Sequence, residues 1–122
     1  MSDLETNLAK AEKYLSRFAK DGVLNHIKGQ AVPADDGATF TTTSPVDQHH
    51  LANVAHGKAS DIDKAARAAD AAFKGWSETD PKERARILHR IADGIEARAE
   101  EIAFVECMDT GQALRFMSKA AI

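Results

Sequence analysis

A long amphipathic pattern in the second half of the chain limits the possible folds most. Asp80 precedes Pro81, and a proline directly after a capping aspartate is typical of a helix start. Apolar residues then recur at every third or fourth position for about six turns, and they are Leu88, Ile91, Ala92, Ile95, Ala99, Ile102 and Ala103. This spacing predicts one continuous helix from residue 81 to the turn at residues 109–111, with an apolar stripe that another surface must cover.

Three other stretches have helical spacing. In residues 4–18 the apolar side chains share one face, and Asp21-Gly22 provides a C-terminal cap. In residues 60–76, Ser60 followed by Asp63 resembles a capping box. A last helix begins at residue 113 and its pattern stops at Ile122 without a cap, so we expect the chain to be interrupted within this helix.

The region between the first two helices has the composition of β-strands. Lys28-Gly29 separates two short extended stretches and predicts a tight hairpin turn. A β-branched stretch ends at Ser44-Pro45, and a further strand follows the polar turn at residues 47–50. The four expected strands are residues 23–27, 30–32, 39–43 and 51–55. They predict a small antiparallel sheet that needs a cover, because isolated hairpins are marginal in water.

These elements predict an α/β fold in three parts: an N-terminal amphipathic helix (1–22), a β-hairpin region (23–57) and a helical part (58–122) that is incomplete at its C-terminus. The chain has 122 residues, of which 23 are alanine and only seven are aromatic. Because alanine contributes little transfer free energy, a core made from this composition alone would be thin. The composition therefore also points to a missing partner surface.

Charge and composition exclude several kinds of partner. The formal net charge is -3 and the two signs are interleaved, which argues against nucleic acid as a partner. No stretch approaches the roughly 18 apolar residues of a membrane span, and no secretory leader is visible at the N-terminus. One cysteine cannot form an internal disulfide, which fits a cytoplasmic location.

Two groups of residues are candidates for chemistry. Cys107 is the only thiol, but it lies toward the end of the long helix, where the helix dipole disfavours a thiolate. A structural role is therefore favoured over a nucleophile. His49, His50 and His56 lie near Asp47, but their spacing is not that of a zinc site, which favours surface histidines in a turn. No catalytic residue is predicted on these grounds.

Five segments resemble, in the same order, motifs of the aldehyde dehydrogenase superfamily. The hairpin at Lys28-Gly29 resembles the opening strand pair of that family. Residues 37–45 resemble its strand that ends in Asn-Pro, with Ser44 in place of the usual asparagine. The other three matches are the "AV-AA--AF--W" segment in residues 61–76, the "ER--IL--IAD" helix in residues 83–93 and the "E-LDTGK" turn in residues 106–112. The turn at residues 47–50 departs from the family's usual Thr-Gly-Glu.

The resemblance implies the first part of a Rossmann-like domain that binds NAD or NADP in the full-length family. It also implies a longer chain, in which three catalytic residues follow the position where this sequence ends: a cysteine that attacks the aldehyde, a glutamate that activates water and an asparagine that stabilises the oxyanion. Accordingly we expect no catalytic and no cofactor-binding residue in this chain. One family site carries over as an expectation: a Na⁺ or K⁺ site formed by Thr42, Thr43 and Asp109. A helix-capping role for Asp109 is the alternative.

The sequence thus predicts the N-terminal part of an aldehyde dehydrogenase, inactive alone, that oxidises a semialdehyde. The N-terminal helix and the variant turn in residues 106–115 resemble a branch that acts on 5-carboxymethyl-2-hydroxymuconate semialdehyde in the breakdown of homoprotocatechuate. The expected partner is the remainder of the dehydrogenase, or a second copy, bound through exposed apolar helix faces. The alternative function is a short, non-enzymatic interaction or oligomerisation module.

Overall fold

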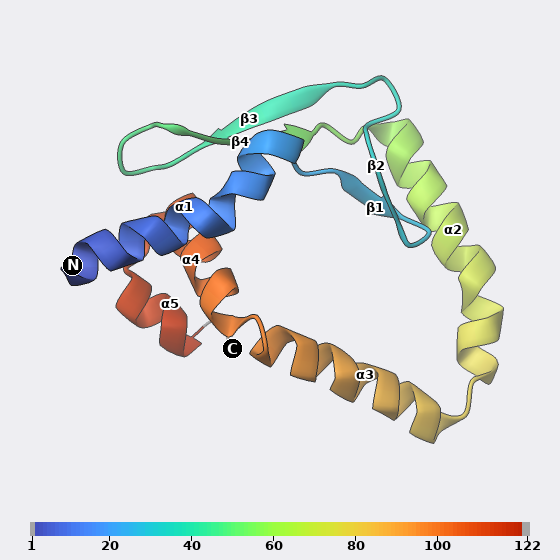
Figure 1. Cartoon of the computed structure of the whole chain (residues 1–122). Helices are drawn as coiled ribbons and strands as arrows, with labels where there is room; N and C mark the ends of the chain where they lie inside the picture. Colours follow the sequence, from blue (N-terminus) through green and yellow to red (C-terminus); the bar gives the residue numbers. More distant parts are fainter. Residues whose placement is uncertain (1, 121–122) are drawn as a thin grey trace.

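The computed structural model describes residues 2–120 and shows five helices and two β-hairpins in this part of the chain. The order of elements is α1 (Asp3–Asp21), β1 (Asn25–Ile27), β2 (Gln30–Val32), β3 (Thr39–Thr43), β4 (His50–Ala55), α2 (Ala59–Glu78), α3 (Pro81–Glu96), α4 (Ala99–Thr110) and α5 (Leu114–Ala120). The predicted α/β class is confirmed. The chain follows an open frame: α2 and α3 form one side, and α1, α4 and α5 gather on the other (Figure 1).

Helix α1 has a cap at each end, which explains why its bounds follow the sequence pattern. The Ser2 side chain accepts a hydrogen bond from the backbone N–H of Glu5, and the Glu5 carboxylate accepts one in return from the backbone N–H of Ser2. At the other end, Gly22 has φ 71° and its N–H donates to the carbonyl of Phe18. A non-glycine residue would be strained at this φ.

The strands form two separate two-stranded antiparallel sheets rather than one. In the first, β1 pairs with β2 through a turn in which Lys28 (φ 54°) and Gly29 (φ 74°) are both left-handed, as the sequence predicts. Val23 was expected in the same strand, but it forms a parallel bridge to Val54 of the second sheet instead. Strand β4 is therefore bonded on both sides, by β3 on one edge and by Val23 on the other.

The predicted continuous helix from residue 81 to 110 is wrong, because Ala97 and Arg98 separate α3 from α4. Arg98 has φ -113° and ψ 15°, which lies outside the helical region. The break changes the direction of the chain (Figure 1). As a result α4 buries Ala103 and Phe104 against other elements, whereas α3 buries none of its residues.

Helix α2 begins earlier than the Ser60–Asp63 pattern suggests. Lys58 is the residue before the helix, and its backbone N–H donates to Oδ2 of Asp61 at 2.9 Å. The other oxygen of Asp61 accepts from the backbone N–H of Asp35 at 2.9 Å. Asp61 is only 5% exposed. Its carboxylate thus caps the helix and ties it to the loop after β2, which is the physical reason for the earlier start.

The buried core is small and lies where α1, β4, α4 and α5 meet. Its apolar members are Ala11, Leu51, Ala52, Ala55, Ala103, Phe104 and Met117, and Ala34 is buried in the loop after β2. Helices α2 and α3 contribute none of them, and their large apolar side chains remain exposed, as at Phe73 (67%) and Leu88 (60%). The last predicted helix is present as α5, but residues 121 and 122 lie outside the described residues. Among residues 2–120, no helix is long and apolar enough to cross a membrane.

Replacing Asp61 with alanine is expected to lower the free energy of unfolding by about 1–3 kcal/mol, because two backbone N–H groups lose a charged acceptor. Urea unfolding followed by circular dichroism would measure this. Asp63→Ala is the matched control on the same helix, since Asp63 forms only an exposed ion pair with Arg67 and its loss should change little. Equal effects of the two substitutions would contradict the proposed role of Asp61.

Candidate functional site

The candidate site lies where the end of β3 meets the end of α4. Thr42 is half-buried on β3, and its hydroxyl donates a hydrogen bond of 3.0 Å to Oδ1 of Asp109 on α4. The two residues are 67 positions apart in the sequence. The contact leaves the second carboxylate oxygen of Asp109 and the lone pairs of the Thr42 hydroxyl as hard oxygen donors, which suit a small cation.

The turns that follow the two residues hold them together. Gly111 caps α4 in the left-handed conformation (φ 74°), and a Cβ at this position would lie only 2.9 Å from Cγ of Pro45. Only glycine lets the two turns approach so closely. On the other side, Ser44 is 1% exposed and its Oγ accepts from the N–H of Val46 at 3.2 Å. Ser44 therefore organises the turn against which the end of α4 packs.

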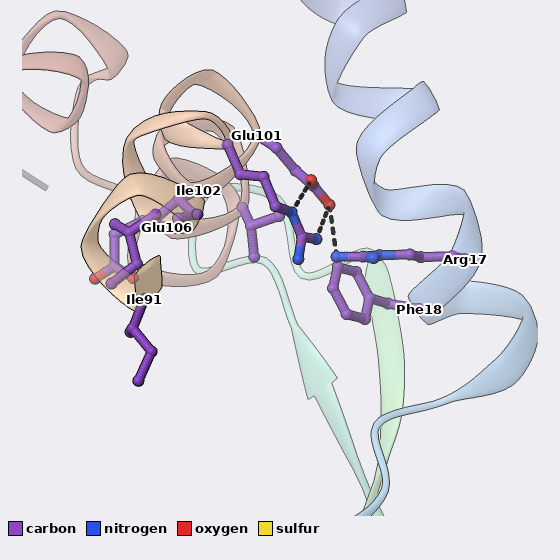
Figure 2. Close-up of a pocket in the computed structure, with 10 residues that line it drawn as sticks. Arg17, Phe18, Ile91, Glu101, Ile102 and Glu106 are labelled. Carbon is purple, nitrogen blue, oxygen red and sulfur yellow. Dashed lines mark hydrogen bonds and ion pairs between the residues drawn. The ribbon is translucent and has the colours of Figure 1, made fainter. Parts of the chain in front are cut away.

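Helix α1 packs on α4, which carries Asp109, and on β4, the strand paired with β3. Its charged side chains reach two glutamates of α4. Glu100 forms an ion pair with Lys10 and accepts a hydrogen bond of 2.6 Å from the Tyr14 hydroxyl. Arg17 lies 2.5 Å from Glu101, and Figure 2 shows this pair beside Phe18. The bracing contacts explain how residues distant in sequence keep their mutual position.

These contacts shift the pKa values of the groups involved. Hydrogen bonding to Lys10 and Tyr14 lowers the pKa of Glu100. Hydrogen bonding to Arg98, together with the charge of Arg17, lowers the pKa of Glu101. The Glu100 carboxylate in turn raises the pKa of Tyr14. The two lowered pKa values favour the ionic form of the glutamates, and the raised pKa of Tyr14 favours its neutral hydroxyl.

Acidification is therefore expected to loosen α1 from α4. Because the folded pKa of both glutamates lies below the unfolded value, their stabilising effect is complete above that value and is lost as the pH falls through the folded pKa. Thermal unfolding measured from about pH 7 to about pH 3 should show a falling midpoint. The double variant Glu100→Gln, Glu101→Gln should show a flatter profile, with the remaining slope due to Glu5, Asp35, Asp36 and Asp47, whose pKa values are also lowered. A profile as steep as that of the unchanged chain would contradict the bracing role.

A hollow of about 390 Å³ lies next to the Thr42–Asp109 contact, and both residues line it. The rest of its lining is apolar and comes from α1, β3, β4 and α4. The Thr42–Asp109 hydrogen bond thus lies at the edge of a hollow whose other lining residues are apolar. Asp109 itself is exposed, so its carboxylate is open to solvent at this end of the hollow.

The other residues singled out by the sequence do not join this contact. Thr43 is exposed, and no hydrogen bond joins it to Asp109 among the described residues. Cys107 is half-buried on α4. The histidines have separate partners: His49 Nδ1 lies 2.5 Å from Asp47, His50 lies 3.2 Å from Asn53 through Nε2, and His56 packs edge-to-face on Phe40. Within residues 2–120 no three His, Cys, Asp or Glu side chains gather as a metal site.

Sequence reasoning missed the bracing residues Tyr14, Glu100 and Glu101. They lie on helices whose charges look like ordinary solvated faces, and Tyr14 and Glu100 are 86 positions apart. One signal was available: Tyr14 is the only tyrosine of the chain and lies in the otherwise polar flank of α1. A buried or half-buried tyrosine usually finds a partner for its hydroxyl, so a distant acceptor could have been expected.

Together, the two hairpins, the alanine-rich helices and the hydroxyl–carboxylate contact form an α/β segment with largely uncovered helices. Comparison with known proteins then gives the family, since the model of the aldehyde dehydrogenase family matches residues 32–122. The chain belongs to the aldehyde dehydrogenase family and corresponds to its N-terminal part.

Three similar proteins define the relationship further. The NADP/NAD-dependent aldehyde dehydrogenase PuuC of Escherichia coli is 43% identical over 91 residues, which are 73% of this chain and 18% of that protein. The 2-hydroxymuconic semialdehyde dehydrogenase of Pseudomonas sp. strain CF600 is 41% identical over 74% of this chain and 19% of its own length. The crystal structure of HpcC from Thermus thermophilus superposes with a TM-score of 0.87 and 40% identity over 91% of this chain and 22% of that one. The chain thus spans about a fifth of the length of these relatives.

Proposed function

We propose that this chain is the N-terminal part of an NAD(P)-dependent aldehyde dehydrogenase that oxidises a semialdehyde to the acid. The match of residues 32–122 to the family carries the proposal. The part played by these residues is structural: they supply the hairpins and helices on which the cofactor domain is built. Catalytic residues and cofactor-binding residues are proposed to lie elsewhere in the enzyme, so the 122 residues alone should be inactive.

The residues present do not fit NAD or NADP. A dinucleotide pyrophosphate usually binds open N–H groups at a helix N-terminus. At α2 the N–H of Lys58 donates to the carboxylate of Asp61 at 2.9 Å, and at α3 the side chain of Asp80 accepts from the N–H of Lys82 at 2.9 Å. A second negative charge would be repelled from both ends. No step of hydride transfer is therefore assigned to this chain.

A cation fits the chemistry of the chain better. We propose that Thr42 and Asp109, with the backbone of Thr43, contribute oxygen ligands to a Na⁺ or K⁺ ion at the edge of the cofactor domain. The hydrogen bond of 3.0 Å between Thr42 and Asp109 supports the proposal, because it holds two oxygen-bearing side chains together. The ion would carry positive charge to the end of α4, where the helix dipole favours it.

The proposed substrate class is a semialdehyde from the breakdown of aromatic compounds. The likeness to HpcC and to a 2-hydroxymuconic semialdehyde dehydrogenase supports this class. Within it, 5-carboxymethyl-2-hydroxymuconate semialdehyde is the substrate that the turn in residues 106–115 suggests. We also retain the three-part organisation (1–22, 23–57 and 58–122) and a cytoplasmic location as predictions.

A chimeric enzyme tests the proposed function. The whole chain replaces the residues of the E. coli relative up to the end of its aligned segment, and reduction of NAD⁺ or NADP⁺ is measured with a semialdehyde. We expect activity from the chimera and none from the chain alone. The matched control is the same chimera with Asp109→Asn and Thr42→Val, which should lose any activation by K⁺ or Na⁺. A folded chimera without activity would overturn the proposal.

A second candidate function is an interaction or oligomerisation module without enzymatic activity. The exposed apolar faces of α2 and α3 favour it, because Ile62 (67%), Phe73 (67%) and Leu88 (60%) have no cover from the described chain. This candidate predicts that the isolated chain is a folded oligomer of defined size. Sedimentation and circular dichroism decide between the two functions, since a molten or aggregating chain would count against the module.

A further inference from the structure

The break between α3 and α4 is not favoured by the residues that form it. Residues 96–101 all have side chains that suit a helix interior. Arg98 precedes α4, and its side chain makes no capping hydrogen bond. The first N–H groups of α4 therefore lack the partners that a continuous helix from Pro81 to Thr110 would give them. The ion pair between Arg98 and Glu101 would survive in that helix, because the two residues are three positions apart.

The contacts that a continuous helix would lose come from α1. Glu100 forms an ion pair with Lys10 and accepts a hydrogen bond of 2.6 Å from the Tyr14 hydroxyl. Glu101, one position further, lies 2.5 Å from Arg17. The three α1 residues are spaced by four and three positions, so they share one face of the helix and contact the first turn of α4 directly after the break. Helix α1 thus fixes the direction in which α4 leaves the break.

Few other contacts oppose a change of direction at the break. Within residues 2–120, α1 is the only extensive partner of α4 that is distant in the sequence. Helix α5 also packs on α4, but it follows α4 directly in the chain and can move with it. Helix α3 packs extensively on no described element and buries none of its residues. At the far end of α4, Asp109 binds Thr42, and this contact exists only while α4 keeps its present direction.

We propose that α1 is a clamp on an element with two states. With α1 docked, α3 and α4 are separate helices, and with α1 released they join into one helix from Pro81 to Thr110. About 16 Å of helix separates Arg98 from Asp109, so joining carries Asp109 away from Thr42 and opens their hydrogen bond. Docking of α1 therefore controls whether the candidate site is assembled. This switch goes beyond the proposed function and does not depend on it, because it involves no cofactor and no catalytic step.

The distance between two spin labels in the 122-residue chain tests the proposal. Lys82→Cys on α3 and Glu106→Cys on α4 carry the labels, with Cys107→Ser to remove the only native thiol. In a joined helix the two positions are about 36 Å apart, and in the present structure the change of direction brings them closer (Figure 1). Lys10→Glu with Arg17→Glu, the release variant, reverses the two cations that bind α4. We expect one short distance in the unchanged chain and a new maximum at about 36 Å in the release variant.

Reversal of charge at two other positions of α1 is the matched control. Lys13→Glu with Lys20→Glu changes the charge of α1 by the same amount, but neither lysine forms an ion pair with α4 in the described chain. We expect the control to keep the short distance of the unchanged chain. A release variant that also keeps the short distance overturns the proposal, and so does a control with the same new maximum.

A substitution at the break keeps the test decisive if release unfolds the chain and broadens the distances. Arg98→Ala and Arg98→Ser both remove the ion pair with Glu101. Alanine favours a helix interior, whereas serine favours a helix start and forms a capping-box sequence with Glu101. In the release variant, the ratio of joined to separate helices should be about tenfold higher with alanine than with serine. Equal ratios, or a broad distribution of distances with both, overturn the proposal.

Discussion

Phe104→Ala is expected to abolish the cooperative folding of the chain. Phe104 is 5% exposed and is the largest side chain of the buried core. Its ring lies 5.7 Å from that of Tyr14, so it joins α4 to α1 as well as to α5. Truncating a buried phenylalanine costs about 3–5 kcal/mol, whereas whole domains are stable by only about 5–15 kcal/mol. For a core this small, we expect loss of most of the unfolding transition in urea.

The matched control for this prediction is Phe73→Ala on α2. Phe73 is 67% exposed, so its truncation leaves no cavity in the described chain and should change the unfolding midpoint little. The comparison also tests the position of the core. If Phe73→Ala were as damaging as Phe104→Ala, helix α2 would be packed in solution in a way that the structure does not show.

Local signals predicted those parts of the fold whose cause is local. The cap at Gly22 and the left-handed turn at Lys28-Gly29 depend on backbone conformations that these residues favour, and both were found where expected. The start of α2 was misplaced because serine is a favoured N-cap residue and lysine is not, so the sequence pointed to Ser60 rather than Lys58. The contact of Asp61 with Asp35, which lies 26 residues earlier, decides between them.

The break at Ala97-Arg98 has no local signal at all. Neither residue disfavours a helix, and the apolar stripe continues through both. The break is favoured by tertiary packing, because it lets Phe104 enter the core beside α1 while α3 runs in another direction. Tertiary packing commonly overrides propensity in this way. The same reasoning applies to the site, where the meeting of Thr42 and Asp109 was expected only through the family resemblance.

Gly111→Ala is expected to separate the two halves of the site. Gly29→Ala is the control, because Gly29 has the same φ of 74° but no atom within 4 Å of the added Cβ. In the control, the free energy of unfolding should fall only by the cost of placing alanine in the left-handed backbone conformation, about 1–2 kcal/mol. Gly111→Ala adds the contact with Pro45 at 2.9 Å and should cost roughly 1–3 kcal/mol more.

The source of the additional cost can be isolated with a second substitution. Pro45→Ala removes the Cγ atom that the new methyl group of Gly111→Ala would meet at 2.9 Å, so the double variant should recover most of the difference from Gly29→Ala. Urea unfolding gives the coupling free energy, which should be about 0.5–3 kcal/mol. If the two substitutions were additive, close approach of the turns would not be what positions Asp109 beside Thr42. Recovery would instead show that glycine is required at position 111 for the close approach of the two turns as well as for the left-handed cap of α4.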